Sequence, residues 1–533
     1  MKQCPRCSRQ YFDDTLNFCL EDGEWLRADD VASSPTLFMP HPYAPVFDEP
    51  ATQVFSAATE SALLPAPDRS IAVLPFVHLS KDPDDEYFCD GLAEELLNIL
   101  AKIDGMKVAA RTSAFSFKGK NATAAEIGKT LGVGTILEGS VRKSGETLRI
   151  NVQLVNASDG YQMWSERYDR EMRNVFDIQD EVARSVVNEL RTRLLGENDS
   201  ASKLSDLVRE LKHYRTDVEA YQIYLRGRHF LNKFTTSDAY HAVELFNQAL
   251  TVDPNCATAH AGLADAYIML TEMGPMPSHE AMPLAKAAAM KALSLDDELA
   301  EAYSAIGMVL QDYEYDFEGA EREFKRSIDL SPNNPIPRQS YGILLTELGR
   351  FDEAELQFAR VFEVDPLSVV ANWIYSFCLF LSRRYDEALE RAEKALELDP
   401  NFGVAYLTVA FAYQMKGAYD KSAEAYANCS EVMGFPENAQ FVRESYKNGW
   451  DAFLRAMAGP DRPMTFSSYI IAVFAATFGD KDLAFESLDA SYEKRESHIV
   501  MVKVDPRFDV LRDDPRFSEL VDRVGFRKQV DLT

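Results

Sequence analysis

Three cysteines and an aspartate near the N-terminus have the types and spacing of a metal site. Cys4 and Cys7 are separated by two residues, and Cys19 and Asp22 repeat that separation further along the chain. Two turns that each present a pair of ligands in this way can surround one tetrahedral Zn²⁺ ion. Asp22 stands where a fourth cysteine would be expected, so the identity of the fourth ligand stays open, and Gly23 permits a tight turn beside it. We predict a structural zinc ion held by Cys4, Cys7, Cys19 and Asp22; the alternative is three reduced thiols.

The same N-terminal segment resembles the short bacterial zinc ribbons of the CPxC…FCxxDG type. A segment this short needs a metal to hold a fold, which favours the zinc interpretation. Ribbons of this kind can contact nucleic acid, but acidic residues outnumber basic ones in this segment. The basic residues are Lys2, Arg6 and Arg9, and the acidic ones are Asp13, Asp14, Glu21, Asp22 and Glu24. A structural or protein-contact role therefore fits the ribbon better.

No arrangement of side chains typical of catalysis stands out in the sequence. The eight histidines are scattered, and no HExxH pair, GxSxG elbow or kinase motif set occurs. Gly128-Lys129-Thr130 has the ending of a phosphate-binding loop, but the glycine required upstream is replaced by Thr123 and the tripeptide falls in a predicted helix. We therefore predict that the chain is not an enzyme.

Composition limits the classes of partner. Lys and Arg number 56 against 85 Asp and Glu in 533 residues, and the resulting net charge of −29 repels phosphate backbones, so no nucleic-acid partner is expected. No segment approaches the roughly 20 consecutive apolar residues of a membrane helix, and the N-terminus lacks the apolar core of a signal peptide. We expect a cytoplasmic protein without membrane insertion.

The remaining four cysteines lie in apolar contexts typical of buried thiols. They are Cys89, Cys256, Cys378 and Cys429.

Residues 70 to 190 alternate between strand and helix patterns. A short apolar run, SIAVLPF at 70–76, predicts a buried strand, and the apolar residues of EYFCDGLAEELLNILAKI recur at helical spacing. MKVAAR predicts a second strand and residues 124–131 a second helix. Alternating apolar and polar residues from 134 to 170 predict a three-stranded antiparallel meander, and VFDIQDEVARSVVNELRTRL predicts a closing helix.

This region resembles the TolB-like amino-terminal domain that bacteria attach to regulatory and repeat modules. The resemblance is carried by IAVLPF at 71–76, DEYFCDGLAEELLNIL at 85–100, ARTSAFSFKGK at 110–120, LGVGTILEGSVRKSG at 131–145 and LVNASDGYQMWSERYDR at 154–170. It implies a compact α/β domain that serves protein interaction and regulation.

A sequence motif recurs five times from residue 248 onward, as QALTVDPN, KALSLDDE, RSIDLSPN, RVFEVDPL and KALELDPN. The last three intervals are 35, 34 and 34 residues, a period typical of a helical solenoid whose stacked repeats expose a concave surface. These segments resemble tetratricopeptide (TPR) repeats; one carries Tyr341, Gly342, Leu345, Gly349, Ala354, Phe358 and Pro366. The first interval is longer, which predicts an insertion at TEMGPMPSHEAMP that forms a loop on one rim.

The TPR resemblance implies that fixed positions of each first helix line the concave face and form a protein-binding groove. The groove residues are Met308, Gln339, Ile343, Trp373, Phe377, Phe380, Leu407, Phe411 and Gln414, with Gln311 among further candidates. Their aromatic content favours an apolar or helical peptide as the guest, because aromatic rings supply much contact energy per residue. The alternative is that the same stripe packs against the α/β domain or the tail of this chain.

These patterns together predict a multidomain protein. The expected parts are a zinc-ribbon-like knuckle at 1–26, a Pro-rich linker at 27–68, a TolB-like α/β domain at 69–195, a connecting helix or linker at 196–216, an all-α TPR superhelical solenoid at 217–434, and a degenerate repeat with a C-terminal cap at 435–533. We expect a bacterial adaptor or scaffold for protein–protein interactions in signalling or assembly. The alternative is a sensor whose α/β domain binds a small molecule or nucleotide and relays this to a separate output protein. The sequence leaves the partner, the pathway and self-association open.

Overall fold

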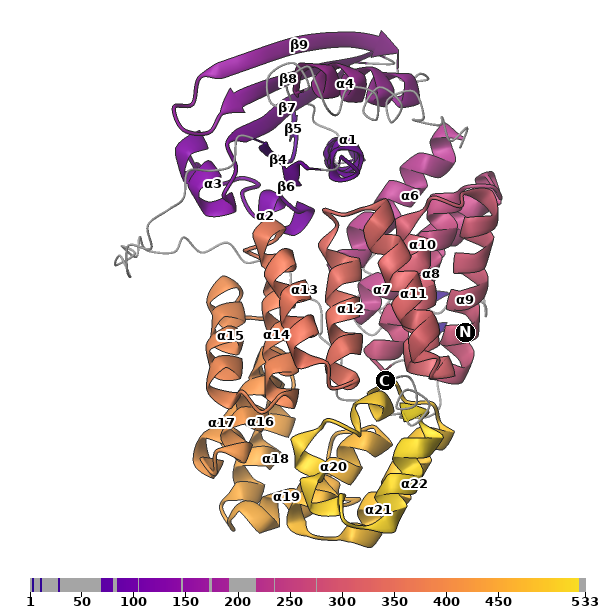
Figure 1. The fold of residues 1–533 in the computed structure, drawn as a ribbon. Helices are drawn as coiled ribbons and strands as arrows, with labels where there is room; N and C mark the ends of the chain where they lie inside the picture. The colour runs from indigo at the N-terminus through magenta and orange to yellow at the C-terminus, as the bar shows by residue number, and fades with distance from the viewer. Residues whose placement is uncertain are drawn as a thin grey trace.

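A computed structural model of the chain describes residues 2–3, 10–11, 27–28, 69–79, 84–103, 105–144, 147–171, 175–190, 217–233, 235–274 and 276–526. An α/β unit lies at one end of a curved helical array, and a C-terminal group of helices lies at the other (Figure 1). Among the described helices, none combines the length and the apolar character needed to cross a membrane.

Three short strands near the N-terminus form an antiparallel sheet in the order β2-β1-β3. They are β1 (Lys2–Gln3), β2 (Gln10–Tyr11) and β3 (Arg27–Ala28). The predicted metal ligands Cys4, Cys7, Cys19 and Asp22 lie outside the described residues, as do the Pro-rich segment 29–68 and the connecting segment 191–216.

The α/β unit contains a six-stranded mixed sheet. Its strands are β4 (Ser70–Val73), β5 (Val77–His78), β6 (Lys107–Val108), β7 (Thr135–Ser144), β8 (Thr147–Asn156) and β9 (Gln162–Glu171). The order is β6-β4-β7-β8-β9, and β5 also pairs with β7. Strand β4 runs parallel to β6 and β7, whereas β7, β8 and β9 are successively antiparallel, which confirms the predicted meander.

Helices cover both faces of this sheet. They are α1 (Asp84–Ala101), α2 (Arg111–Phe115), α3 (Ala124–Leu131) and α4 (Val175–Leu190). Because successive strand residues point to opposite faces, Ile71 and Val73 pack in the core that includes α1 and α4, while Ala72 packs with α3. The first core also contains Tyr221, Tyr224 and Leu225 of the first array helix, so it continues from the sheet into the helical array.

The helical array consists of antiparallel pairs. The paired helices are α6 (Val218–Leu231) with α7 (Thr236–Val252), α8 (Ala257–Glu272) with α9 (Ser278–Leu295), α10 (Ala300–Val309) with α11 (Phe317–Leu330), α12 (Pro335–Glu347) with α13 (Phe351–Val364), α14 (Val369–Leu381) with α15 (Tyr385–Leu398), and α16 (Ala405–Met415) with α17 (Tyr419–Val432). A π-helical turn, η3 (Leu310–Glu314), extends α10. Each copy of the recurring motif falls at the C-terminal end of the second helix of a pair, so the predicted solenoid is confirmed.

Small residues let the two helices of a pair approach each other closely. A Cβ added at Gly342 would lie 2.7 Å from the ring of Phe358, and one at Gly307 would lie 2.6 Å from the ring of Phe324. Each glycine is on a first helix and each phenylalanine on the second helix of the same pair. The small and aromatic positions of the repeat are therefore complementary halves of one contact.

The insertion in the second pair is largely helical, which corrects the expected rim loop. Helix α9 begins at Ser278 and contains Pro283, so only residues 273–277 separate it from α8. Ala281 and Met282 are fully buried in this added turn. Their burial offsets the hydrogen bond that Pro283 cannot donate.

The C-terminal helices fold back onto the inner face of the array. They are α18 (Pro436–Tyr446), α19 (Trp450–Ala458), α20 (Ser468–Phe478), α21 (Lys481–Glu493), the 3₁₀ helices η4 (Ser497–Met501) and η5 (Pro506–Leu511), and α22 (Pro515–Arg523). We call residues 494–526 the return segment. Within it, Arg495 donates to the Tyr313 carbonyl at 2.9 Å and Lys503 to the Leu348 carbonyl at 3.1 Å. The return segment therefore contacts repeats that lie far earlier in the chain (Figure 1).

The α/β unit docks on the array through α2. Asp365, which is 1% exposed, accepts hydrogen bonds from the amide and the hydroxyl of Ser113 at 3.1 and 2.6 Å. The Ser113 hydroxyl in turn accepts from the Leu367 amide at 2.9 Å, and the Ala110 amide donates to the Val364 carbonyl at 2.7 Å. Burial raises the pKa of Asp365 to about 6. This joint fixes the sheet relative to the inner helices.

Candidate protein-binding site

A cavity of about 1660 Å³ lies among the inner helices, the α/β unit and the return segment. We call it the chamber. Its walls come from the first helices of successive pairs, while Glu94 and Phe115 line it from the α/β unit, and His498 and Met501 line it from the return segment. Small-molecule sites occupy roughly 300–1,000 Å³, so the chamber has room for a larger guest.

Most of the predicted groove residues line this chamber. They are Met308, Gln339, Ile343, Trp373, Phe377, Leu407 and Phe411. Trp373, Phe377 and Leu407 are half-buried, so each keeps part of its apolar surface open to the cavity. The structure thus brings these side chains to one surface, and their role in binding stays a prediction.

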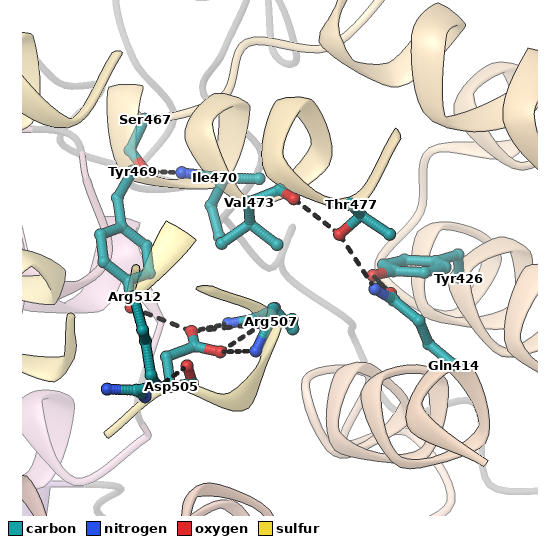
Figure 2. Close-up of polar contacts among 10 residues, drawn as sticks. All are labelled: Gln414, Tyr426, Ser467, Tyr469, Ile470, Val473, Thr477, Asp505, Arg507 and Arg512. Atoms are coloured by element: carbon teal, nitrogen blue, oxygen red, sulfur yellow. Dashed lines mark hydrogen bonds and ion pairs between the residues drawn. The ribbon is translucent and has the colours of Figure 1, made fainter. Parts of the chain in front are cut away.

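Phe380 and Gln414 lie elsewhere. Phe380 is fully buried, and its ring centroid is 5.6 Å from that of Phe411. The Gln414 amide nitrogen donates to the Thr477 hydroxyl of α20 at 3.3 Å, and its carbonyl oxygen accepts from the Tyr426 hydroxyl at 3.4 Å (Figure 2). These two side chains join the array to the C-terminal helices and are not open to a guest in this structure.

A buried ion pair within the return segment positions Arg507 against the aromatic wall. The carboxylate of Asp505 accepts from Nη2 of Arg507 at 2.6 Å and from the hydroxyl of Tyr469 at 2.9 Å (Figure 2). The two charged side chains are 0% and 2% exposed. The guanidinium of Arg507 also lies 4.2 Å from the ring centroid of Phe411. The tail of the chain therefore covers one end of the aromatic stripe, while Trp373 and Phe377 remain partly open.

Charges on the opposite side of the chamber are largely paired. Glu94 of α1 accepts from Arg111 at 2.9 Å and from Arg228 at 3.3 Å, and Arg228 also lies 3.5 Å from Asp265. Burial raises the pKa of Glu94, but the two guanidinium groups outweigh it and leave the pKa below its usual value. For Asp265 burial prevails over the single arginine and raises the pKa to about 7.

A second group of carboxyls on the wall was not predicted from the sequence. Three carboxyls line the chamber: Glu272 and Glu347 are the last residues of α8 and α12, and Asp312 lies within η3. The Gln311 amide donates to Oε2 of Glu347 at 2.9 Å. Burial raises the pKa of Glu272 to about 7, and burial together with neighbouring carboxylates raises the pKa values of Asp312 and Glu347 well above normal. A sequence signal for this group does exist: an acidic residue follows the apolar stretch near the C-terminal end of successive first helices.

The Gly128-Lys129-Thr130 tripeptide lies inside α3, as predicted. A Cβ at Gly128 would lie 2.4 Å from the Cβ of Ala157, so this glycine permits the helix to pack closely on the β8–β9 turn. The Thr130 hydroxyl donates to the Glu126 carbonyl at 2.8 Å within the same helix. Both residues thus have structural roles in the α/β unit.

Comparison with protein families identifies two parts of the chain. Residues 67–185 match the second domain of HilA/YgeH-like transcriptional regulators, and residues 342–402 match the tetratricopeptide repeat. The first of these corrects the expected TolB-like resemblance, because the matching family is a different one. The second confirms TPR repeats in the C-terminal part.

Two kinds of curated relative share segments with this chain. A Rhizobium meliloti protein named "Putative adenylate cyclase 3" is 38% identical over 216 residues, which are 40% of this chain and 35% of the relative. The transcriptional regulator HilA of Salmonella paratyphi A is 30% identical over 136 residues, 26% of this chain and 24% of the relative. The chain therefore spans about a third or less of either protein. The name of the first relative overturns the prediction that the chain is not an enzyme.

Solved structures align with parts of this chain. YrrB, described as a TPR protein with an unusual peptide-binding site, aligns over 38% of this chain and 99% of its own at 21% identity and a TM-score of 0.25. PilW, described as a type IV pilus biogenesis factor, aligns over 42% of this chain and 98% of its own at 18% identity and a TM-score of 0.34. The C-terminal part of the chain is a helical TPR-like solenoid, and an α/β region precedes it.

Proposed function

We propose that this chain is a regulatory protein-binding module whose chamber receives a polypeptide segment of a partner. The observation that supports this most directly is a cavity of about 1660 Å³ on the inner face of the solenoid, with the half-buried Trp373, Phe377 and Leu407 on its wall. Half-exposed aromatic side chains in a concave site are typical anchors for peptide recognition.

The regulatory part of the proposal rests on the α/β unit. Its sequence matches a domain of transcriptional regulators, and this unit contributes directly to the chamber through Glu94 and Phe115. A guest in the chamber would contact the α/β unit as well as the repeats, so its binding could change how the two parts dock. The net charge of −29 favours a protein over a nucleic acid as that guest.

Site-specific crosslinking tests the location of the partner. A photo-crosslinking amino acid at Ile336, which is 56% exposed and lines the chamber, is expected to capture a discrete partner in native cells. The matched control is Leu356, which is 65% exposed on α13 and lies outside the chamber. Equal capture from both positions, or capture from neither, would contradict the proposal. Because one relative is named as a cyclase, the purified chain is also assayed for conversion of ATP to cyclic AMP.

We also propose that the N-terminal segment holds a structural zinc ion through Cys4, Cys7, Cys19 and Asp22. Cys4 and Cys7 fall in the connection between β1 and β2, and the other two fall in the connection between β2 and β3. Elemental analysis is expected to give about one zinc per chain. The Cys7→Ser variant should lose it, whereas Cys256→Ser, a change at a buried thiol of α8's N-terminal end, should keep it.

A further inference from the structure

The three wall carboxyls of Glu272, Asp312 and Glu347 have no basic partner within the described part of the chain. Asp312 is 5% exposed and Glu347 is 1% exposed, yet the ion pairs found among the described residues include none of the three. By contrast, the buried carboxylates Glu94 and Asp505 each have an arginine. Asp365 also lines the chamber without a basic partner, but its carboxylate accepts two hydrogen bonds from Ser113.

Two oxygen atoms beside these carboxyls lack hydrogen-bond partners in the described structure. They are Oε1 of Gln311 and Oε1 of Glu347, both buried and both on residues that line the chamber. Gln311 is 1% exposed, and its amide nitrogen is already committed to Glu347. An unpaired buried acceptor costs about 1–3 kcal/mol, so a donor supplied by a ligand would be favoured here. We call Glu272, Gln311, Asp312 and Glu347 the acidic niche.

The backbone around the acidic niche also favours a cation. Its residues lie at helix C-termini, where unpaired carbonyl groups carry partial negative charge. Gln311 and Asp312 lie in the π-helical turn η3, a local distortion that is common at functional sites. Nearby, the return segment supplies Arg495 to the Tyr313 carbonyl and Lys503 to the Leu348 carbonyl. Basic side chains therefore already dock at neighbouring helix ends.

The shape of the niche fits an extended cation better than a metal ion. No group of three or more His, Cys, Asp or Glu residues in the described part of the chain is arranged to hold a metal. The niche also adjoins the apolar wall. Cys378 of α14 hydrogen-bonds with Thr346, and Glu347 helps to raise the pKa of its thiol. The neighbouring residue, Phe377, lines the chamber. A guest with one basic group and adjacent apolar groups would satisfy both surfaces.

We propose that the acidic niche binds the ammonium or guanidinium group of a Lys or Arg side chain on the partner polypeptide, whose apolar neighbours contact Phe377 and Trp373. This inference rests on the proposed function, since it names the chemistry of the guest. The carboxylates accept from the cationic N–H groups, and the Gln311 carbonyl oxygen accepts one further hydrogen bond. A free polyamine offers the same ammonium chemistry but lacks apolar side chains for the aromatic wall.

The test uses the full-length chain and synthetic peptides. A hexapeptide library with one fixed position is screened first, and we expect selection of Lys or Arg at one position among apolar residues. A selected arginine peptide is then compared with its citrulline counterpart, which has nearly the same shape and no charge. The arginine peptide should bind at least about tenfold more tightly, because a hydrogen bond to a charged group is worth at least that factor.

Substitutions in the acidic niche test whether it is the source of the preference for arginine over citrulline. The Glu347→Gln variant keeps an oxygen for the Gln311 amide but removes the carboxyl group that a bound cation would ionise, and it should reduce the arginine preference to about twofold or less. Asp312→Asn is a second variant, used if the first folds poorly. The matched control is Glu390→Gln on the exposed face of α15, which should leave the preference unchanged. Melting curves for each variant show that the fold is kept.

The possible outcomes separate this inference from the proposed function. Peptide binding without a basic preference, or a preference that survives both niche substitutions, overturns the inference and leaves the peptide-binding function standing. Absence of peptide binding together with absence of crosslinking from Ile336 overturns both. Spermidine that binds the wild-type chain and not Glu347→Gln, while basic peptides fail to bind, would identify a polyamine as the guest and contradict a polypeptide.

Discussion

Removal of the Asp505 carboxylate should release the return segment from the array. This carboxylate accepts four hydrogen bonds in the range 2.6–2.9 Å, from the amide, Nε and Nη2 of Arg507 and from the hydroxyl of Tyr469. The Asp505→Ala variant leaves the guanidinium of Arg507 buried beside Phe411 without a counter-charge. The Asp505→Ala substitution therefore acts on a buried contact between the return segment and the chamber wall, and not on an exposed one.

The expected loss is about 3–5 kcal/mol, the usual cost of breaking a buried ion pair by removing one partner. If the return segment opens as a unit, this corresponds to roughly 10²- to 10⁴-fold faster amide exchange, since each 1.4 kcal/mol is a factor of ten. The segment is expected to open before the array unfolds, because repeats contact mainly their neighbours.

Hydrogen exchange with mass spectrometry measures this effect peptide by peptide, which suits a multidomain chain that need not unfold in a single step. Asp509→Ala is the matched control in the same η5 helix, because Asp509 pairs with Arg383 and Arg512 but is 44% exposed. Exposed pairs contribute about 0–1 kcal/mol, so this control should exchange nearly as the wild type does.

A double variant, Asp505→Leu with Arg507→Met, separates charge from packing. Apolar residues of similar volume often replace a buried ion pair without loss, so the double variant should recover most of the protection. Equal exchange in Asp505→Ala and Asp509→Ala would refute the reasoning, because it would mean that the buried pair does not hold the return segment.

Three other outcomes follow from the structure. Asp365→Ala removes the two hydrogen bonds that hold α2 and should weaken docking of the α/β unit by about 1–3 kcal/mol, seen as faster exchange in α2 and unchanged exchange in α15. Gly128→Val places side-chain atoms where even a Cβ would lie 2.4 Å from a neighbouring Cβ, so the α/β unit should melt at lower temperature, whereas Lys129→Ala on the exposed face of α3 should melt as the wild type does. Burial raises the pKa of Glu95 and of Glu272 to about 7, so between pH 4.5 and 7 the folded state holds protons that the unfolded state has released. The free energy of unfolding should therefore fall as the pH rises from about 5 to about 7. A melting temperature that does not change across that range would contradict this.

The repeat array was predictable because its determinants are local and periodic. The recurring segments that contain Pro332, Pro366 and Pro400 mark the ends of α11, α13 and α15. The paired small and aromatic positions, such as Gly342 and Phe358, are contacts within one repeat. Alternation of apolar and polar residues likewise predicted the β7-β8-β9 meander, because adjacent antiparallel strands follow one another in the chain.

Family resemblance and the absence of motifs were weaker guides. The α/β architecture was predicted, but the matching family is that of HilA/YgeH-like regulators and not the TolB-like one. The missing catalytic motifs predicted a chain without enzymatic activity, and the name of a relative shows why absence of a motif is poor grounds for that conclusion. Catalytic groups can converge from distant segments, which no local pattern reveals.

Through its resemblance to TPR repeats, the sequence by itself indicated which positions of each first helix face the inside of the solenoid. Only the tertiary structure decided what each stripe residue contacts. Phe380 is fully buried while Trp373 stays half-open on the same helix. The contacts of Phe380 include Phe411 of the next repeat and also Arg507, more than 120 residues away, whose guanidinium lies 5.4 Å from the Phe380 ring centroid. The chamber likewise depends on the Ser113–Asp365 and Arg495–Tyr313 contacts, which join residues 252 and 182 positions apart. Periodicity specifies that a face is buried, whereas the partner that buries it is set by how distant surfaces fit together.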